Sequence, residues 1–204
     1  MHDELDILRE VGSIAASHGS VALSEILGRR INLLMPSVDI VSSSGIPTKT
    51  DIENVGMAVI SKMITGLKGQ AVFMLDDKNA YKLIELSNNI SNEDKKSSVI
   101  TEVGISTIKE VGSIVTNAYL NALSIMFKKS ILSLPPVLIS GTISEIINII
   151  IASSGDDDCV LLVEAIFEEP HEKIKGGFYL VLIQEAAVAI QEACKQMLFE
   201  LAKR

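Results

Sequence analysis

The sequence predicts an α/β fold of the α+β type, in which long helices pack on a largely antiparallel sheet. Two observations favour it. A segment near the start recurs one hundred residues later, and each copy combines a long amphipathic helix with short apolar strands joined by polar loops. We therefore expect the 204 residues to form one domain made of two repeats, about 1–90 and 99–204, related by a pseudo-twofold axis.

The repeat is clearest in two segments of eighteen residues. Residues 10–27 read EVGSIAASHGSVALSEIL and residues 110–127 read EVGSIVTNAYLNALSIMF, so eight of the eighteen positions are identical. The register continues without a gap to Pro36 and Pro136. The charged segment SNEDKKSS at 91–98 is typical of a linker between two halves.

Each half predicts the same order of elements. Apolar residues at helical spacing indicate a long helix, and a strand that ends at a proline follows it. Two further strands form a hairpin, and a helix closes the half. The expected helices span 4–28, 77–88, 100–128 and 185–203, with one more at 142–153, and the expected strands span 31–36, 55–63, 69–75, 131–136, 159–167 and 176–183.

Composition argues against several classes of function. The net charge is −8 with no basic stripe, which disfavours nucleic-acid binding. The acidic start disfavours a secretory signal, and no apolar run approaches the ~18 residues of a membrane span, so a cytoplasmic protein is expected. The two cysteines, Cys159 and Cys194, lack metal-ligand spacing and are interpreted as reduced core thiols. Together with three scattered histidines, they predict no metal site and no cofactor of the protein's own.

The repeated pentapeptide EVGSI carries the candidate functional residues. Glu10 and Ser13 are three residues apart, which places both side chains on one face of a helix, and Glu110 and Ser113 repeat the arrangement. A Glu–Ser pair on an amphipathic helix is most often a solvated stripe. Core packing does not explain, however, why these polar residues match when the polar residues at positions 17 and 117 differ. A functional role for both pairs is the sharper hypothesis.

Gly12 and Gly112 lie inside the predicted helices, between the glutamate and the serine. Glycine in a helix interior costs up to about 1 kcal/mol relative to alanine. Its presence in both copies predicts that the sheet or a partner packs closely against each helix at this point.

The spacing of these residues resembles the signature of the CheC, CheX and FliY chemotaxis phosphatases. That signature is Asp or Ser, three residues, Glu, two residues, Asn, twenty-two residues and Pro. Both halves fit the spacing, and two copies in one chain resemble the CheC type in particular. The matching positions are Asp6, Glu10, Ser13 and Pro36 in the first half and Ser106, Glu110, Ser113 and Pro136 in the second.

The resemblance implies hydrolysis of the aspartyl phosphate on the response regulator CheY. In that family the Glu engages the regulator and the Asn amide positions the attacking water, while the receiver domain brings the Mg²⁺. Placing one water in line is a sufficient contribution, because the receiver already supplies the metal and the electrostatics of phosphoryl transfer. Phosphorylated CheY is therefore the expected partner, with Glu10, Ser13, Glu110 and Ser113 at the two sites.

The chain departs from the signature at Ser13 and Ser113, which stand where the family has asparagine. A hydroxyl also donates and accepts, but it ends about one bond closer to the backbone. We expect weak or absent phosphatase activity, with docking through Glu10 and Glu110 retained. Two alternatives stand beside the enzyme. One is a binding module for phosphorylated CheY or CheD without turnover. The other is a structural part of the flagellar switch, since the middle domain of FliM shares the fold but lacks the Glu motif.

The resemblance also implies a second surface, because CheC proteins bind the deamidase CheD partly through a helix after the second proline. The matching segment is TISEIINIIIAS at 142–153, with isoleucines nearly all round the expected helix. Such a helix is either fully buried or covered in part by a partner. The region is a candidate CheD surface without assigned contact residues.

Overall fold

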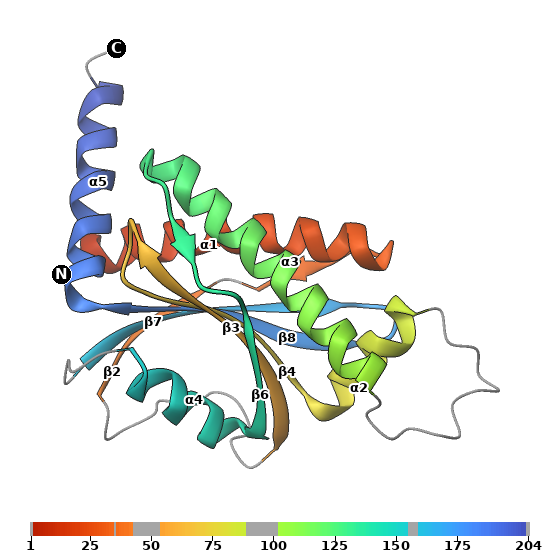
Figure 1. The fold of residues 1–204 in the computed structure, drawn as a ribbon. Helices are drawn as coiled ribbons and strands as arrows, with labels where there is room; N and C mark the ends of the chain where they lie inside the picture. Colours follow the sequence, from red (N-terminus) through yellow and green to blue (C-terminus); the bar gives the residue numbers. More distant parts are fainter. Residues whose placement is uncertain (1, 35, 43–53, 89–101, 155–158, 203–204) are drawn as a thin grey trace.

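One antiparallel sheet of eight strands runs through the part of the chain that the structure describes (Figure 1). The computed structural model describes residues 2–34, 36–42, 54–88, 102–154 and 159–202. The strand pairs within these ranges are antiparallel, which confirms the predicted α/β fold with its largely antiparallel sheet. The predicted linker at 91–98 lies outside the described residues.

Apart from α4, the described elements follow one another in the same order in both halves. In the first half they are α1 (His2–Leu27), β1 (Asn32–Leu33), β2 (Ser37–Ser42), β3 (Val55–Thr65), β4 (Gly69–Asp76) and α2 (Asp77–Ser87). In the second half they are α3 (Glu102–Phe127), β5 (Leu132–Ser133), β6 (Val137–Thr142), α4 (Ile143–Ala152), β7 (Cys159–Glu169), β8 (Ile174–Ile183) and α5 (Gln184–Ala202). A duplicated chain would produce this correspondence, and the duplication itself stays a prediction.

Each half contributes a two-residue strand and a six-residue strand to the hairpin of the other half, and β1 and β5 are the short ones. β2 of the first half pairs with β7, and β6 of the second half pairs with β3. The two hairpins meet at the centre of the sheet, where β4 pairs with β8. The registers correspond, since Val38 pairs with Val163 at one edge and Leu138 pairs with Val59 at the other. Neither half therefore completes its own part of the sheet.

The strands beside the two prolines differ from the prediction. The strands expected at 31–36 and 131–136 are reduced to β1 and β5, of two residues each. Longer strands, β2 and β6, begin directly after Pro36 and Pro136. A proline removes only its own N–H, so pairing pauses at the ring and resumes at the next residue. Treating the proline as the end of a strand overlooked the six-residue strand that follows it.

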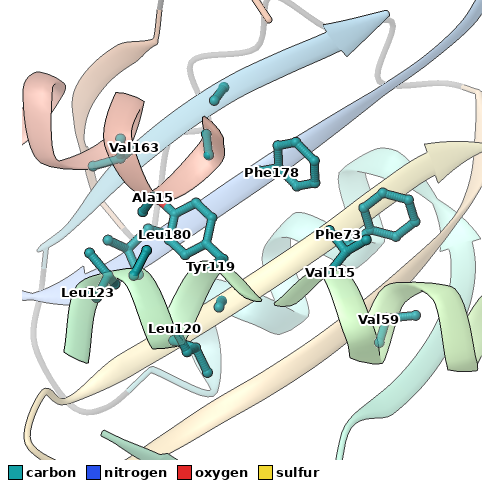
Figure 2. Packing of buried hydrophobic residues seen from close by; sticks show 14 of the residues in the cluster. Ala15, Val59, Phe73, Val115, Tyr119, Leu120, Leu123, Val163, Phe178 and Leu180 are labelled. Carbon is teal, nitrogen blue, oxygen red and sulfur yellow. The ribbon is translucent and has the colours of Figure 1, made fainter. Parts of the chain in front are cut away.

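Helices cover both faces of the sheet (Figure 1). α1 and α3 pack against each other on one face, where α2 and α5 join them, and α4 lies on the other face. The main core fills the space between the long helices and the sheet (Figure 2). It includes the rings of Phe73, Phe167 and Phe178, whose centroids lie 5.0 to 5.9 Å apart. A second cluster packs beneath α4.

Helix ends are fixed by side chains that the sequence supplies. Asp76, the N-cap of α2, accepts a 2.7 Å hydrogen bond from the backbone N–H of Asn79. At the C-terminal ends of α1 and α3, the hydroxyls of Ser24 and Ser124 each donate a hydrogen bond to the backbone carbonyl five residues later, both at 2.6 Å. These bonds explain the repeated serine at 24 and 124 as part of the fold.

Candidate functional site

Gly12 and Gly112 are the points where the motif helices meet the sheet. A Cβ atom on Gly112 would lie 2.5 Å from a methyl carbon of Val59, and one on Gly12 would meet a methyl of Val163. The two valines hold corresponding places in β3 and β7, each paired with an edge strand of the other half. The predicted close packing is confirmed, and the packing element is the sheet.

The motif residues beside these glycines point away from the sheet. Glu10 and Glu110 are exposed, and Ser13 and Ser113, one turn further along, are half-buried. The sequence spacing predicted one helix face for each pair, and the exposure agrees. Each pair forms a small polar surface on the outer side of α1 or α3.

The polar ends of these side chains are unengaged within the described part of the chain. There, Glu10 and Glu110 form no ion pair, and the hydroxyls of Ser13 and Ser113 donate to no protein atom. Only the backbone carbonyls of the two serines accept hydrogen bonds, from hydroxyls further along each helix. The carboxylates and hydroxyls are thus available to a partner.

The first position of the signature differs between the halves. Asp6 and Ser106 are both exposed, one turn before the glutamate. Asp6 accepts a 2.8 Å hydrogen bond from Arg9 Nη1 in an ion pair along the helix. Because both side chains are exposed, such a pair contributes at most about 1 kcal/mol, and a partner can displace it easily.

The two signature prolines belong to the sheet layer rather than to the outer helix face. Pro36 is buried and Pro136 is half-buried. Each directly precedes the edge strand that pairs with the valine beneath a motif glycine. The structure therefore brings the glutamate and serine of each half to one surface and puts the prolines in the support beneath it.

Ile14 and Ile114, the last residues of the pentapeptide, also face outward. Their side chains are 40% and 44% exposed. Both isoleucines lie beyond the buried stripe of their helix, which in α1 contains Leu8, Val11 and Ala15 at this level. Periodicity does not separate an apolar residue inside the buried stripe from one just beyond its edge, so no pattern in the sequence predicts this exposure.

Different chemistry supports the two motif helices from below. Under α3, the buried hydroxyls of Ser61 and Thr116 lie 3.0 Å apart, and Thr116 Oγ1 donates to the carbonyl oxygen of Gly112 at 2.8 Å. The corresponding positions under α1 are Ala16 and Ala165, which are both buried. A hydroxyl chain thus ties β3 to the motif turn of α3, while apolar packing holds the motif turn of α1.

A bacterial chemotaxis protein resembles this chain along most of its length. No protein-family model matches the chain. Over 187 residues, however, it is 27% identical to the CheY-P phosphatase CheC of Bacillus subtilis, in an alignment that covers 88% of each chain. The chain thus resembles members of the CheC, CheX and FliY family in sequence and fold.

Solved structures from this family and from FliM share the fold. FliY of Thermotoga maritima matches with a TM-score of 0.77 at 23% identity, over 96% of this chain and 98% of the FliY chain. A chain of the CheX–CheY–BeF3–Mg²⁺ complex of Borrelia burgdorferi matches with a TM-score of 0.55 at 20% identity, over 85% and 97%. The FliM middle domain of Vibrio alginolyticus matches with a TM-score of 0.59 at 16% identity, over 92% and 99%. Since differently named proteins share the fold, it does not assign an activity by itself.

α4 is the helix of the candidate CheD surface. Five of its six isoleucines are buried, and Ile149 is 51% exposed. Of the two alternatives, a buried helix or one covered by a partner, burial in the core thus holds for most of the isoleucines. The exposed side of α4 also carries the polar residues Glu145 and Asn148. Hydrogen bonds from the backbone N–H and hydroxyl of Thr142 hold the pKa of Glu145 below its ordinary value. CheD binding stays a prediction.

Neither a metal-binding cluster nor a membrane-spanning helix occurs among the described residues. These contain no group of three or more His, Cys, Asp or Glu side chains that could hold a metal ion. None of the described helices is both long and apolar enough to cross a membrane. Cys194 is a free, half-buried thiol whose pKa is raised by burial, and the side chain of Cys159 lies outside the described part.

Proposed function

We propose that this chain binds the phosphorylated receiver domain of a CheY-type response regulator through two equivalent surfaces, one on α1 and one on α3. The observation that carries the proposal is the exposed pair Glu10 and Glu110, each with a half-buried serine one turn away at the spacing of the family signature. The relatives support it, since one is named a CheY-P phosphatase and another occurs in a complex with CheY.

The glycine contacts prepare each surface for docking. Because Gly12 and Gly112 pack directly on valines of the sheet, the turn that carries the glutamate and serine has little freedom to move. A side chain on such a turn reaches a partner with less ordering cost than one on a loop. An exposed carboxylate also attracts a cationic partner group and speeds the encounter.

We further infer that any hydrolysis of the aspartyl phosphate at these surfaces is slow. The receiver would supply Mg²⁺, and the partner protein need only hold the attacking water in line with the phosphorus. The hydroxyls of Ser13 and Ser113 can hold a water, but they end closer to the helix than an asparagine amide. A displacement of about 1 Å from the productive position costs about a hundredfold in rate.

Binding is tested with the CheY receiver domain from the same organism, loaded with Mg²⁺ and BeF3⁻ as the mimic of the phosphoryl group. Glu10→Gln and Glu110→Gln together should weaken binding at both surfaces about tenfold by calorimetry. Glu25→Gln is the matched control, because Glu25 is an exposed glutamate of α1 outside the signature. Equal binding of the double variant and the control variant would contradict the proposal.

Hydrolysis is tested by following the decay of phosphorylated CheY with and without this protein. The wild type should accelerate decay only weakly, and the double variant Ser13→Asn, Ser113→Asn should accelerate it about tenfold more or better. Adding Glu10→Gln and Glu110→Gln to the asparagine variant should remove the gain. A wild type as fast as the asparagine variant would show that serine suffices for catalysis.

We propose CheD as a second partner, which would bind through the outer side of α4. Ile149 is the exposed large apolar residue of that helix among those the structure describes, and Asn148 lies beside it. The substitution Ile149→Asp should abolish co-purification with CheD if the surface binds it, while leaving the CheY surfaces on the opposite face of the sheet unaffected. Undiminished co-purification would remove α4 from consideration.

A further inference from the structure

Ile14 and Ile114 occupy corresponding places on the outer faces of α1 and α3. Each lies directly after the signature serine and four residues after the signature glutamate. Residues four apart on a helix are neighbours on its surface, so the glutamate, the serine and the isoleucine form one continuous patch in each half. With side chains 40% and 44% exposed, both isoleucines offer a substantial apolar surface to solvent.

The exposed positions of the two helices have diverged except at two places. Between residues 10 and 25, α1 exposes positions 10, 14, 17, 18, 21 and 25, and the corresponding stretch of α3 exposes 110, 114, 117, 121 and 125. The residues at these positions are identical only for Glu10 with Glu110 and Ile14 with Ile114. At 21 and 121 valine stands against asparagine, and at 25 and 125 glutamate stands against isoleucine.

The fold accounts for four of the other six identical positions in this stretch. Val11 and Leu23, with their counterparts, are buried in the core, and the glycines pack on the sheet. Ser24 and Ser124 fix the helix ends through hydrogen bonds to backbone carbonyls. No such structural task falls to an exposed isoleucine, which as a β-branched residue is also a weaker helix former than leucine or alanine.

We propose that Ile14 and Ile114 are apolar docking contacts for the phosphorylated receiver domain, an inference that rests on the proposed function. The partner surface then pairs an apolar side chain with each isoleucine and a cation with each glutamate. Covering the isoleucine excludes water beside the carboxylate, which strengthens the charge interaction as the local dielectric falls. The isoleucine thereby sets both the affinity and the choice of partner.

The experiment compares exposed apolar residues inside and outside the patch. The test variant is Ile14→Ser with Ile114→Ser, and the matched control is Val21→Ser with Ile125→Ser, two exposed apolar residues further along the same helices. Both are titrated with the CheY receiver domain carrying Mg²⁺ and BeF3⁻. The test variant should bind about tenfold more weakly at each surface, and the control should bind like the wild type. Circular dichroism melts should agree for both, since all four residues are exposed.

Each outcome bears on a different statement. Unchanged binding by the isoleucine variant, when Glu10→Gln with Glu110→Gln does weaken binding, would overturn this inference and leave the proposed function standing. Equal weakening by the test and control variants would also overturn it, because general surface hydrophobicity would then be the cause. A wild type that does not bind the loaded receiver at all would overturn the proposed function and the inference together.

Discussion

α1 and α3 carry the same outward residues, but they rest on different neighbours. Above the sheet, both helices present a glutamate, a serine and an isoleucine at the same spacing. Below, the turn after the motif packs through Thr116 and Ser61 in one half and through Ala16 and Ala165 in the other. The support thus tolerates a change from a hydroxyl pair to an alanine pair, provided that the helix stays at the same height above the strands.

The two helices differ at two further corresponding positions. Gly19 of α1 faces the ring of Phe178, which would lie 3.5 Å from an added Cβ atom, whereas α3 has the buried Tyr119 at that place. Burial raises the pKa of the Tyr119 hydroxyl. Just after the helices, Gly28 has a φ of 59° and Lys128 a φ of 50°, so the same left-handed turn is made once by glycine and once by lysine.

The largest expected effect comes from adding a methyl group at the glycine contacts. Gly112→Ala would bring the new Cβ to 2.5 and 2.6 Å from two carbons of Val59, including the one attached to the strand backbone, so the strand itself must move. At Gly12 only one methyl of Val163 is too close, and a side-chain rotation can relieve it. We expect a loss in unfolding free energy of about 3 kcal/mol for Gly112→Ala and about 1 kcal/mol for Gly12→Ala.

Denaturant unfolding of both variants measures this difference. Val59→Ala should restore part of the stability of Gly112→Ala, because it removes the methyl groups that the new Cβ meets. Equal losses in unfolding free energy at the two glycines would contradict the prediction, because they would mean that β3 and β7 accommodate the added methyl group equally well.

The hydroxyl pair beneath α3 should give the next largest effect. Thr116→Val keeps the shape but leaves the buried Ser61 hydroxyl without its partner, at a cost of about 2 kcal/mol in unfolding free energy. The double variant Thr116→Val, Ser61→Ala removes both hydroxyls and should lose less than the single variant. Additive losses in this double-mutant cycle would argue that the two hydroxyls do not interact.

The smallest effect is expected at the left-handed turns. Lys128→Gly should raise the unfolding free energy by about 1 kcal/mol, because glycine adopts a positive φ without the clash of a Cβ atom. Gly28→Lys should lower it by a similar amount, and an added Cβ at Gly28 has nothing within 4 Å to clash with, so backbone strain is isolated from packing. In thermal unfolding, the melting temperature should rise for Lys128→Gly and fall for Gly28→Lys. Shifts in the same direction would contradict this prediction.

Sequence signals that act over a few residues predicted much of this fold. The pairing of strands that are distant in the sequence was not predicted. Helical spacing and the polar hairpin loops located the helices and hairpins because these signals act within a few residues. β2 and β6 each pair with a strand of the other half. The alternation of apolar and polar residues along a strand does not indicate which strand is its partner. The Gly12 contact was predicted from the cost of glycine in a helix, but the outward turn of Ile14 depends on the width of the buried stripe. The catalytic or binding roles of the four signature residues stay predictions.

The exchanged strands have a consequence for the order of events during synthesis. Ser37 of β2 pairs with Glu164 of β7, which is made 127 residues later (164 − 37 = 127). The β3–β4 hairpin can close early, but β2 has no edge to join until β7 leaves the ribosome, and pairing over such a separation is slow. Val163, on which Gly12 rests, arrives with that same late strand. The first copy of the signature to be synthesised is thus among the last to acquire its support.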